Sequence, residues 1–115
     1  MQISSPFNRL YHKMLGEISK AGYMKVSTIW QGEAFVFEFS PHRIHMDSVK
    51  QLFKRLNQDY PTDEANTPIS TRKIDSRQLC DHILWLHSVA IENGIETIID
   101  ARSKEDWDRV MERVK

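Results

Sequence analysis

The stretch Asp75–Gly94, DSRQLCDHILWLHSVAIENG, is the most apolar long run in the chain, and it predicts the helix against which the rest of the fold packs. Asp75 and Ser76 are typical N-cap residues, because their side-chain oxygens accept hydrogen bonds from free backbone N–H groups. Gly94 after Asn93 predicts the end of the helix, since glycine adopts the left-handed conformation at little cost. Two neighbouring apolar stripes run between these ends, formed by Leu79, Ile83, Leu86 and Ala90 and by Cys80, Leu84, His87 and Ile91. A helix with nearly two stripes is expected to be buried on more than one side.

Length and composition are typical of one globular domain over residues 1–115. Of these residues, 40% are hydrophobic and 28% are charged. Cys80 is the only cysteine, which excludes an intrachain disulfide. The N-terminus lacks the pattern of a signal peptide, and no apolar run approaches the roughly 20 residues of a membrane span, so we expect a cytoplasmic protein with no membrane association.

The net charge is zero, but the charges are unevenly distributed. Residues 1–58 hold eight Lys/Arg and four Asp/Glu, a balance of +4, whereas residues 59–115 hold eight and twelve, a balance of −4. Such asymmetry permits head-to-tail association, so homodimerisation is one expectation.

The periodicity of the remaining chain predicts an α+β fold, with a small, mostly antiparallel sheet packed against four helices. Helices are predicted over residues 5–21, 47–59, 75–93 and 103–115, beginning at Ser4–Ser5–Pro6, Asp47, Asp75 and Ser103. A hairpin is predicted over residues 24–40 and a further strand over residues 95–100. Residues 69–74 are an alternative edge strand or part of a long loop, 61–74. A loop of this length is a candidate binding segment.

The hairpin prediction includes a register. Gln31–Gly32 as a two-residue loop pairs Trp30 with Glu33 and places Lys25 opposite Glu38, where the opposite charges support the pairing. One face is then strongly apolar, so Phe35, Phe37 and Phe39 are predicted to be core residues.

The histidines do not predict a metal site. A zinc pair on a helix requires i, i+4 spacing, whereas His82 and His87 are five residues apart and point about 140° apart around the helix. His87 lies within the apolar stripe and is predicted to be a core histidine that is hydrogen-bonded to the backbone. We expect no metal and no cofactor.

Catalytic signatures are sparse. Cys80 lies on the apolar side of its helix, where a free cysteine usually acts as a small hydrophobic residue. The cluster His42–Arg43–His45 leaves a small, metal-independent ribonuclease-like enzyme as a weak alternative. The enzyme class is therefore undecided, with a binding role favoured.

A nucleic-acid-binding protein is the stronger alternative. A basic strip on the helix 47–59 and on the connector before it would contact phosphates. The long loop 61–74 would extend this strip. Its predicted members are Arg43, His45, Lys50, Lys54 and Arg55, with Arg72, Lys73 and Arg77 from the loop side.

The favoured function is a non-enzymatic module that binds a macromolecule, most of all a protein, as an inhibitor, adaptor or regulatory subunit. Tryptophan, tyrosine and arginine are enriched at binding hot spots, and this short chain holds three tryptophans and three tyrosines. Trp30 and Gln31 at the hairpin tip are the predicted contacts, together with the basic residues above. Trp107 is predicted to be core, and Trp85 is a second candidate for exposure.

Overall fold

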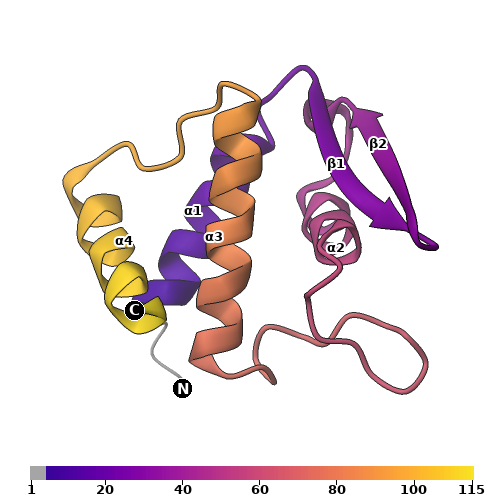
Figure 1. Cartoon of the computed structure of the whole chain (residues 1–115). Helices are drawn as coiled ribbons and strands as arrows, with labels where there is room; N and C mark the ends of the chain where they lie inside the picture. Colours follow the sequence, from indigo (N-terminus) through magenta and orange to yellow (C-terminus); the bar gives the residue numbers. More distant parts are fainter. Residues whose placement is uncertain (1–4) are drawn as a thin grey trace.

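The chain folds around one central helix, α3 (Figure 1). The computed structural model describes residues 5–115, and the side chain of Trp30 lies outside the described part. In chain order the elements are α1 (Pro6–Ile18), β1 (Met24–Trp30), β2 (Glu33–Phe39), the 3-10 turn η1 (Pro41–Arg43), α2 (Met46–Leu56), α3 (Ser76–Glu92) and α4 (Ala101–Val114). In Figure 1, α4 lies on one side of α3, the hairpin with α2 lies on the other, and α1 runs behind α3. The predicted α+β class, four helices with an antiparallel sheet, is confirmed.

Helix α3 begins and ends where its sequence predicts. Asp75 accepts a hydrogen bond from the backbone N–H of Gln78 at 2.8 Å, and the Gln78 side chain accepts one from the backbone N–H of Asp75 at 3.0 Å. This reciprocal capping box satisfies donors that the first helical turn leaves free. Gly94 follows the helix with a φ of 70°, the left-handed conformation that favours glycine.

The core is one cluster of buried apolar side chains from all four helices and β1. Helix α3 supplies the largest share, namely Leu79, Cys80, Ile83, Leu86, Val89 and Ala90. The second predicted stripe is only partly buried, because Ile91 is 57% exposed. The expectation that Ile91 is buried was wrong, since no other element within residues 5–115 covers that edge of the last turn.

The hairpin has the predicted register at every pair from Trp30–Glu33 to Met24–Phe39. Gln31 and Gly32 both have positive φ, 50° and 81°, as a two-residue hairpin turn with the twist of its strands requires. Phe37 and Phe39 pack against the core, as predicted. Phe35 is 47% exposed, so its prediction as a core residue was wrong: it lies nearer the turn than the part of the sheet that the helices cover.

The outer edge of β1 is closed at its base by the end of α3. In this register Lys25 directs its backbone N–H and C=O away from β2. The side-chain amide of Asn93 accepts from the N–H of Lys25 and donates to its carbonyl, both at 2.8 Å. Asn93 therefore takes the place of a neighbouring strand at the base of β1.

The strand predicted at residues 95–100 is absent, since these residues form no ladder. Residues 69–74 take the loop alternative, with a turn at 71–73, and one isolated bridge joins Thr62 and Pro68 nearby. The sheet within residues 5–115 consists of β1 and β2 alone. Ile95 and Ile98 instead pack against the core, and Thr97 is buried, so the segment spans from α3 to α4 as a covering loop.

Several helix boundaries differ from the prediction, and α2 ends at Leu56 rather than at residue 59. Helix α4 begins at Ala101, because Asp100 is its N-cap and forms a capping box with Ser103, the residue predicted as the cap. Helix α2 begins at Met46, because the His45 side chain accepts from the N–H of Asp47 at 3.2 Å. Helix α1 ends at Ile18, followed by a turn. Within residues 5–115 no helix is both long enough and apolar enough to cross a membrane.

The contrast between two isoleucines on α3 tests this packing. Ile83→Ala, at a position with 0% exposure, is expected to lower the free energy of unfolding by about 2–5 kcal/mol through lost burial and a residual cavity. Ile91→Ala, at 57% exposure, is expected to change it by less than about 0.5 kcal/mol. Urea unfolding followed by circular dichroism measures both, and equal losses would contradict the assigned rotation of α3.

Candidate functional site

A buried histidine, His82, is the centre of a polar cluster between the helices. It lies on the inner side of α3 with 1% of its surface exposed. Its Nε2 is 3.2 Å from the Tyr11 hydroxyl on α1, and its Nδ1 is 2.8 Å from Nδ2 of Asn57, the residue that ends α2. The two hydrogen bonds connect three helices through one ring.

The partners of Asn57 determine which nitrogen of His82 carries the proton. The Oδ1 atom of Asn57 accepts the backbone N–H of Asp59 at 3.1 Å, so its amide nitrogen faces His82 as a donor. Nδ1 of His82 must then accept, which leaves the proton on Nε2, where it is donated to the Tyr11 oxygen. Burial, and then the positive charge of Lys54, lower the pKa of His82 to about 3. The ring is therefore neutral at physiological pH.

Aromatic rings surround His82. Trp85 stacks on it with centroids 5.7 Å apart, and Tyr60 contacts it edge-on at 4.8 Å. Burial raises the pKa of Tyr60 to about 12, and its hydroxyl donates to the carbonyl of Ile69 at 2.6 Å, which ties the 61–74 loop to the core. Burial, with Tyr60 nearby, also raises the pKa of Tyr11 above its ordinary value. Neither phenol is an acid or base at neutral pH.

A cavity of about 290 Å³ opens beside this cluster. It is lined by Asn57, Asp59, Tyr60, Pro61, Gln78, Asp81, His82 and Trp85. Both ring nitrogens of His82 are already occupied by structural hydrogen bonds, so the ring is poorly placed to transfer a proton. The carboxylate of Asp81 is also engaged, because it forms an ion pair with Arg77 at 3.3 Å.

The thiol of Cys80 does not complete a catalytic pair. Its side chain is buried, and burial raises its pKa to about 11, so the thiolate that attacks a substrate is scarce at neutral pH. Among residues 5–115, no three histidine, cysteine or carboxylate side chains converge to hold a metal ion. Among the described residues, neither an activated cysteine nor a cluster of metal ligands is therefore found.

A second hollow, of about 380 Å³, lies where the turn half of the hairpin meets the end of α2. We call it the hairpin groove. Its walls are Ser27, Thr28 and Ile29 of β1, Ala34, Phe35 and Val36 of β2, residues 56–59 and Trp85. The Thr28 hydroxyl donates to the Leu56 carbonyl at 2.6 Å, which anchors the hairpin to α2 at this point. Asp59 is the single charged residue among these lining residues.

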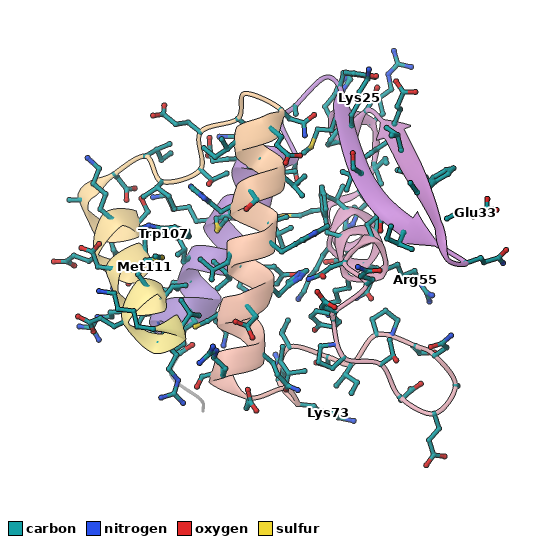
Figure 2. All side chains as sticks on the ribbon, in the orientation of Figure 1. Lys25, Glu33, Arg55, Lys73, Trp107 and Met111 are labelled. Carbon is teal, nitrogen blue, oxygen red and sulfur yellow. The ribbon has the colours of Figure 1, made fainter. Side chains whose placement is uncertain are left out.

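The predicted contact residues of the basic strip do not form one surface. Arg43, His45, Arg55, Arg72 and Lys73 are exposed. Figure 2 shows Arg55 beside α2 and Lys73 well below it in the loop before α3. Lys54 was predicted on the outer face of α2, and that placement was wrong, since it is only 3% exposed. Lys50 is half-buried one turn earlier.

The hairpin tip is described only in part. Gln31 is exposed in the turn, whereas the predicted contact Trp30 has a described backbone at the end of β1 and a side chain outside the described residues. His42, Arg43 and His45 are all exposed, and no hydrogen bond joins their side chains within residues 5–115. The ribonuclease-like alternative therefore gains no support from their arrangement.

The buried histidine is His82 rather than the predicted His87. His87 is half-buried and packs on Trp107 with centroids 4.3 Å apart, and no hydrogen bond to the backbone is found for its ring. Trp107 is itself partly buried against the core, and Trp85 is partly buried as well. A sequence signal for His82 existed: it lies three residues after Leu79 and four before Leu86, on the same side of the helix.

The comparisons with known proteins provide no relative. The chain matches no family model, no curated protein and no solved structure.

Acid is expected to destabilise the fold through His82. The pKa of this histidine is about 3 in the folded chain, against an ordinary 6.5 that applies after unfolding. Between these values the unfolded chain binds the extra proton, so stability falls as the pH drops below about 6.5, by up to about 1.4 kcal/mol per pH unit, and levels off near the lower value.

Urea unfolding at a series of pH values from neutral to acid measures this slope. His82→Gln is expected to be less stable at neutral pH but to have a shallower slope. His42→Gln, at an exposed position, is the matched control and is expected to keep the wild-type slope. A His82→Gln slope as steep as that of the wild type would disprove the assignment.

Proposed function

We propose that this chain is a non-enzymatic binding module whose partner is an extended segment of another protein, held in the hairpin groove. The observation that carries the proposal is the exposure of large apolar side chains on both faces of the turn half of the hairpin. Ile29, Phe35 and Val36 are 44%, 47% and 52% exposed. Ile29 and Val36 lie on one face of the hairpin and Phe35 on the other, and exposed apolar surface typically marks an interaction site.

The backbone beside the groove supports an extended partner. In the observed register, Ser27 and Ile29 on β1 and Ala34, Val36 and Glu38 on β2 direct their N–H and C=O groups outward. Among the described residues no backbone hydrogen bond is found for these groups, whereas Asn93 satisfies those of Lys25. An unpaired sheet edge accepts a further strand, as in peptide recognition by strand addition.

The chemistry of the walls favours a protein over a nucleic acid. The residues that line the groove are apolar or neutral except for Asp59, which is charged. The adjoining strand β2 also carries the exposed carboxylates of Glu33 and Glu38. Phosphates would be repelled here. We infer that the partner segment alternates apolar residues, one of them inserted beside Phe35 and Trp85, with neutral or basic ones.

Selection from a random peptide library displayed on phage tests the proposal directly. Peptides enriched by the immobilised protein are expected to alternate apolar residues and to contain Lys or Arg. Binding of a synthetic version should shift the amide resonances of residues 27–29 and 34–36. Shifts confined to other elements would contradict the groove as the site.

A matched pair of variants separates binding from folding. Phe35→Asp is expected to weaken binding of the selected peptide by roughly tenfold or more, because it places a carboxylate in the apolar wall. Ile91→Asp, at an equally exposed apolar position on α3, is expected to leave affinity unchanged. Both should change the melting temperature little, and equal effects on affinity would contradict the proposal.

The oligomeric state tests whether a second copy of this chain, rather than another protein, occupies the hairpin groove. If the wild type is a dimer on analytical ultracentrifugation and Phe35→Asp makes it a monomer, the hairpin groove is occupied by a second copy. That result would overturn the proposal of a different protein as the partner.

A further inference from the structure

Two lysines one turn apart on α2 carry positive charge that the described residues do not neutralise. Lys54 is 3% exposed, and its Nζ lies 5.5 Å from the centroid of the Tyr60 ring. The Nζ atom of Lys50 lies 5.9 Å from the centroid of the Tyr11 ring. Neither amine belongs to any of the five ion pairs found within residues 5–115. We call these two residues the amine pair.

A buried lysine without a carboxylate is unusual, because lysine is rarely buried unless its charge is paired. The faces of the aromatic rings supply only part of the missing stabilisation, since such contacts contribute about 0.5–2 kcal/mol. Every buried side-chain nitrogen and oxygen in the described residues has a hydrogen-bond partner, and no protein bond is found for the Lys54 amine. Its nitrogen therefore retains contact with solvent and can reach a ligand from there.

The charged groups that shift the pKa values of Lys54, His12 and His82 are the two lysines of the amine pair. Burial, and then the charge of Lys50, lower the pKa of Lys54. The same two causes, in the same order, lower the pKa of His12, while burial and Lys54 lower that of His82. No carboxylate is among the causes that act on these three groups. Lys50 thus opposes positive charge on Lys54 and His12, and Lys54 opposes it on His82, while neither lysine forms an ion pair within residues 5–115.

We propose that the amine pair is the binding site for a compact oxyanion of the phosphate class. Each ammonium rests on a ring face and keeps N–H groups free for charge-assisted hydrogen bonds to the oxygens of the anion. The Tyr11 hydroxyl and both His82 nitrogens are already engaged with one another and with Asn57, so they support the site without contacting the ligand. An anion here would offset the repulsion between the two amines.

Access to Lys54 selects among anions. A side chain that is 3% exposed can be reached by a free or terminal phosphate, which is small and doubly charged, more readily than by the bridging diesters of a nucleic-acid backbone. The site is independent of the hairpin groove, because neither lysine is among the groove's lining residues. Lys50 and Lys54, two residues of the predicted basic strip, thus have a more specific role in this proposal.

Isothermal titration with sodium phosphate into the full chain, at fixed ionic strength in sodium chloride, tests the proposal. Phosphate is expected to bind at one site and to raise the melting temperature, whereas the same ionic strength of chloride is expected to do neither. Absence of both effects would overturn the proposal.

Lys54→Met gives the sharpest contrast. Removal of an unpaired buried charge is expected to leave the melting temperature without phosphate unchanged or higher, while affinity for phosphate falls by roughly tenfold or more. Lys50→Met, at a half-buried position, should weaken phosphate binding in the same way and covers the case in which Lys54→Met fails to fold. Lys73→Met, at an exposed position in the loop, is the control and should bind phosphate as the wild type does.

Two outcomes would overturn the assignment. Retention of wild-type phosphate affinity in Lys50→Met or Lys54→Met would place the anion elsewhere. A single-stranded RNA without terminal phosphates that binds through Lys54 and competes with inorganic phosphate would identify a backbone-binding surface instead of a site for a compact anion.

Discussion

The pair of hydrogen bonds at His82 is the constraint on which the inner geometry depends. Apolar packing alone allows helices to rotate and slide by small amounts, whereas a buried imidazole has one donor and one acceptor and leaves no polar atom to spare. Tyr11 on α1 and Asn57 at the end of α2 use both. Three helices are thereby held in one arrangement. Because Asn57 also accepts from Asp59, the path of the chain as it leaves α2 is determined by the same ring.

Both candidate sites follow from that path. Residues Asn57 and Asp59 line the cavity beside His82 and also the hairpin groove, and Trp85 forms a wall of each. At the amine pair, the charge of Lys54 helps to keep His82 neutral. An ammonium near the ring opposes a second positive charge and so lowers the pKa of His82. The network thus leaves one surface apolar with a carboxylate and another with unpaired amines. A chain with no net charge can therefore have surfaces with opposite preferences for ligands.

Sequence patterns were informative wherever the structure depends on neighbours along the chain. A two-residue turn with alternating apolar residues leaves one register for the hairpin, and Asp75 and Gly94 mark the ends of α3 by local chemistry. They were insufficient where burial depends on what packs from elsewhere. His82 and His87 both lie beside apolar stripes, but only His82 faces the end of α2. Lys54 is polar by residue type, although its position on α2 buries it against Tyr60.

The same distinction explains the missing strand at residues 95–100. Its pattern is typical of β structure, but a strand requires a free edge, and the base of β1 on the side of α3 is occupied by the amide of Asn93. The segment therefore contributes Ile95 and Ile98 to the core without a ladder. Local propensity for strand is weak relative to the availability of a partner.

The length of the hairpin explains why its turn half remains uncovered. Each strand has seven residues and so spans about 23 Å, whereas a helix is only about 10 Å across. In Figure 1 the strands cross α2 rather than run along it, so the end of α2 meets the hairpin at Thr28 and the turn projects beyond it. Val26 at the base is fully buried, while Phe35 on the same face is half exposed. A two-stranded sheet is marginal by itself, so the projecting part gains most from a further surface. A bound strand would pair the free edge of the hairpin and cover its apolar side chains at the same time.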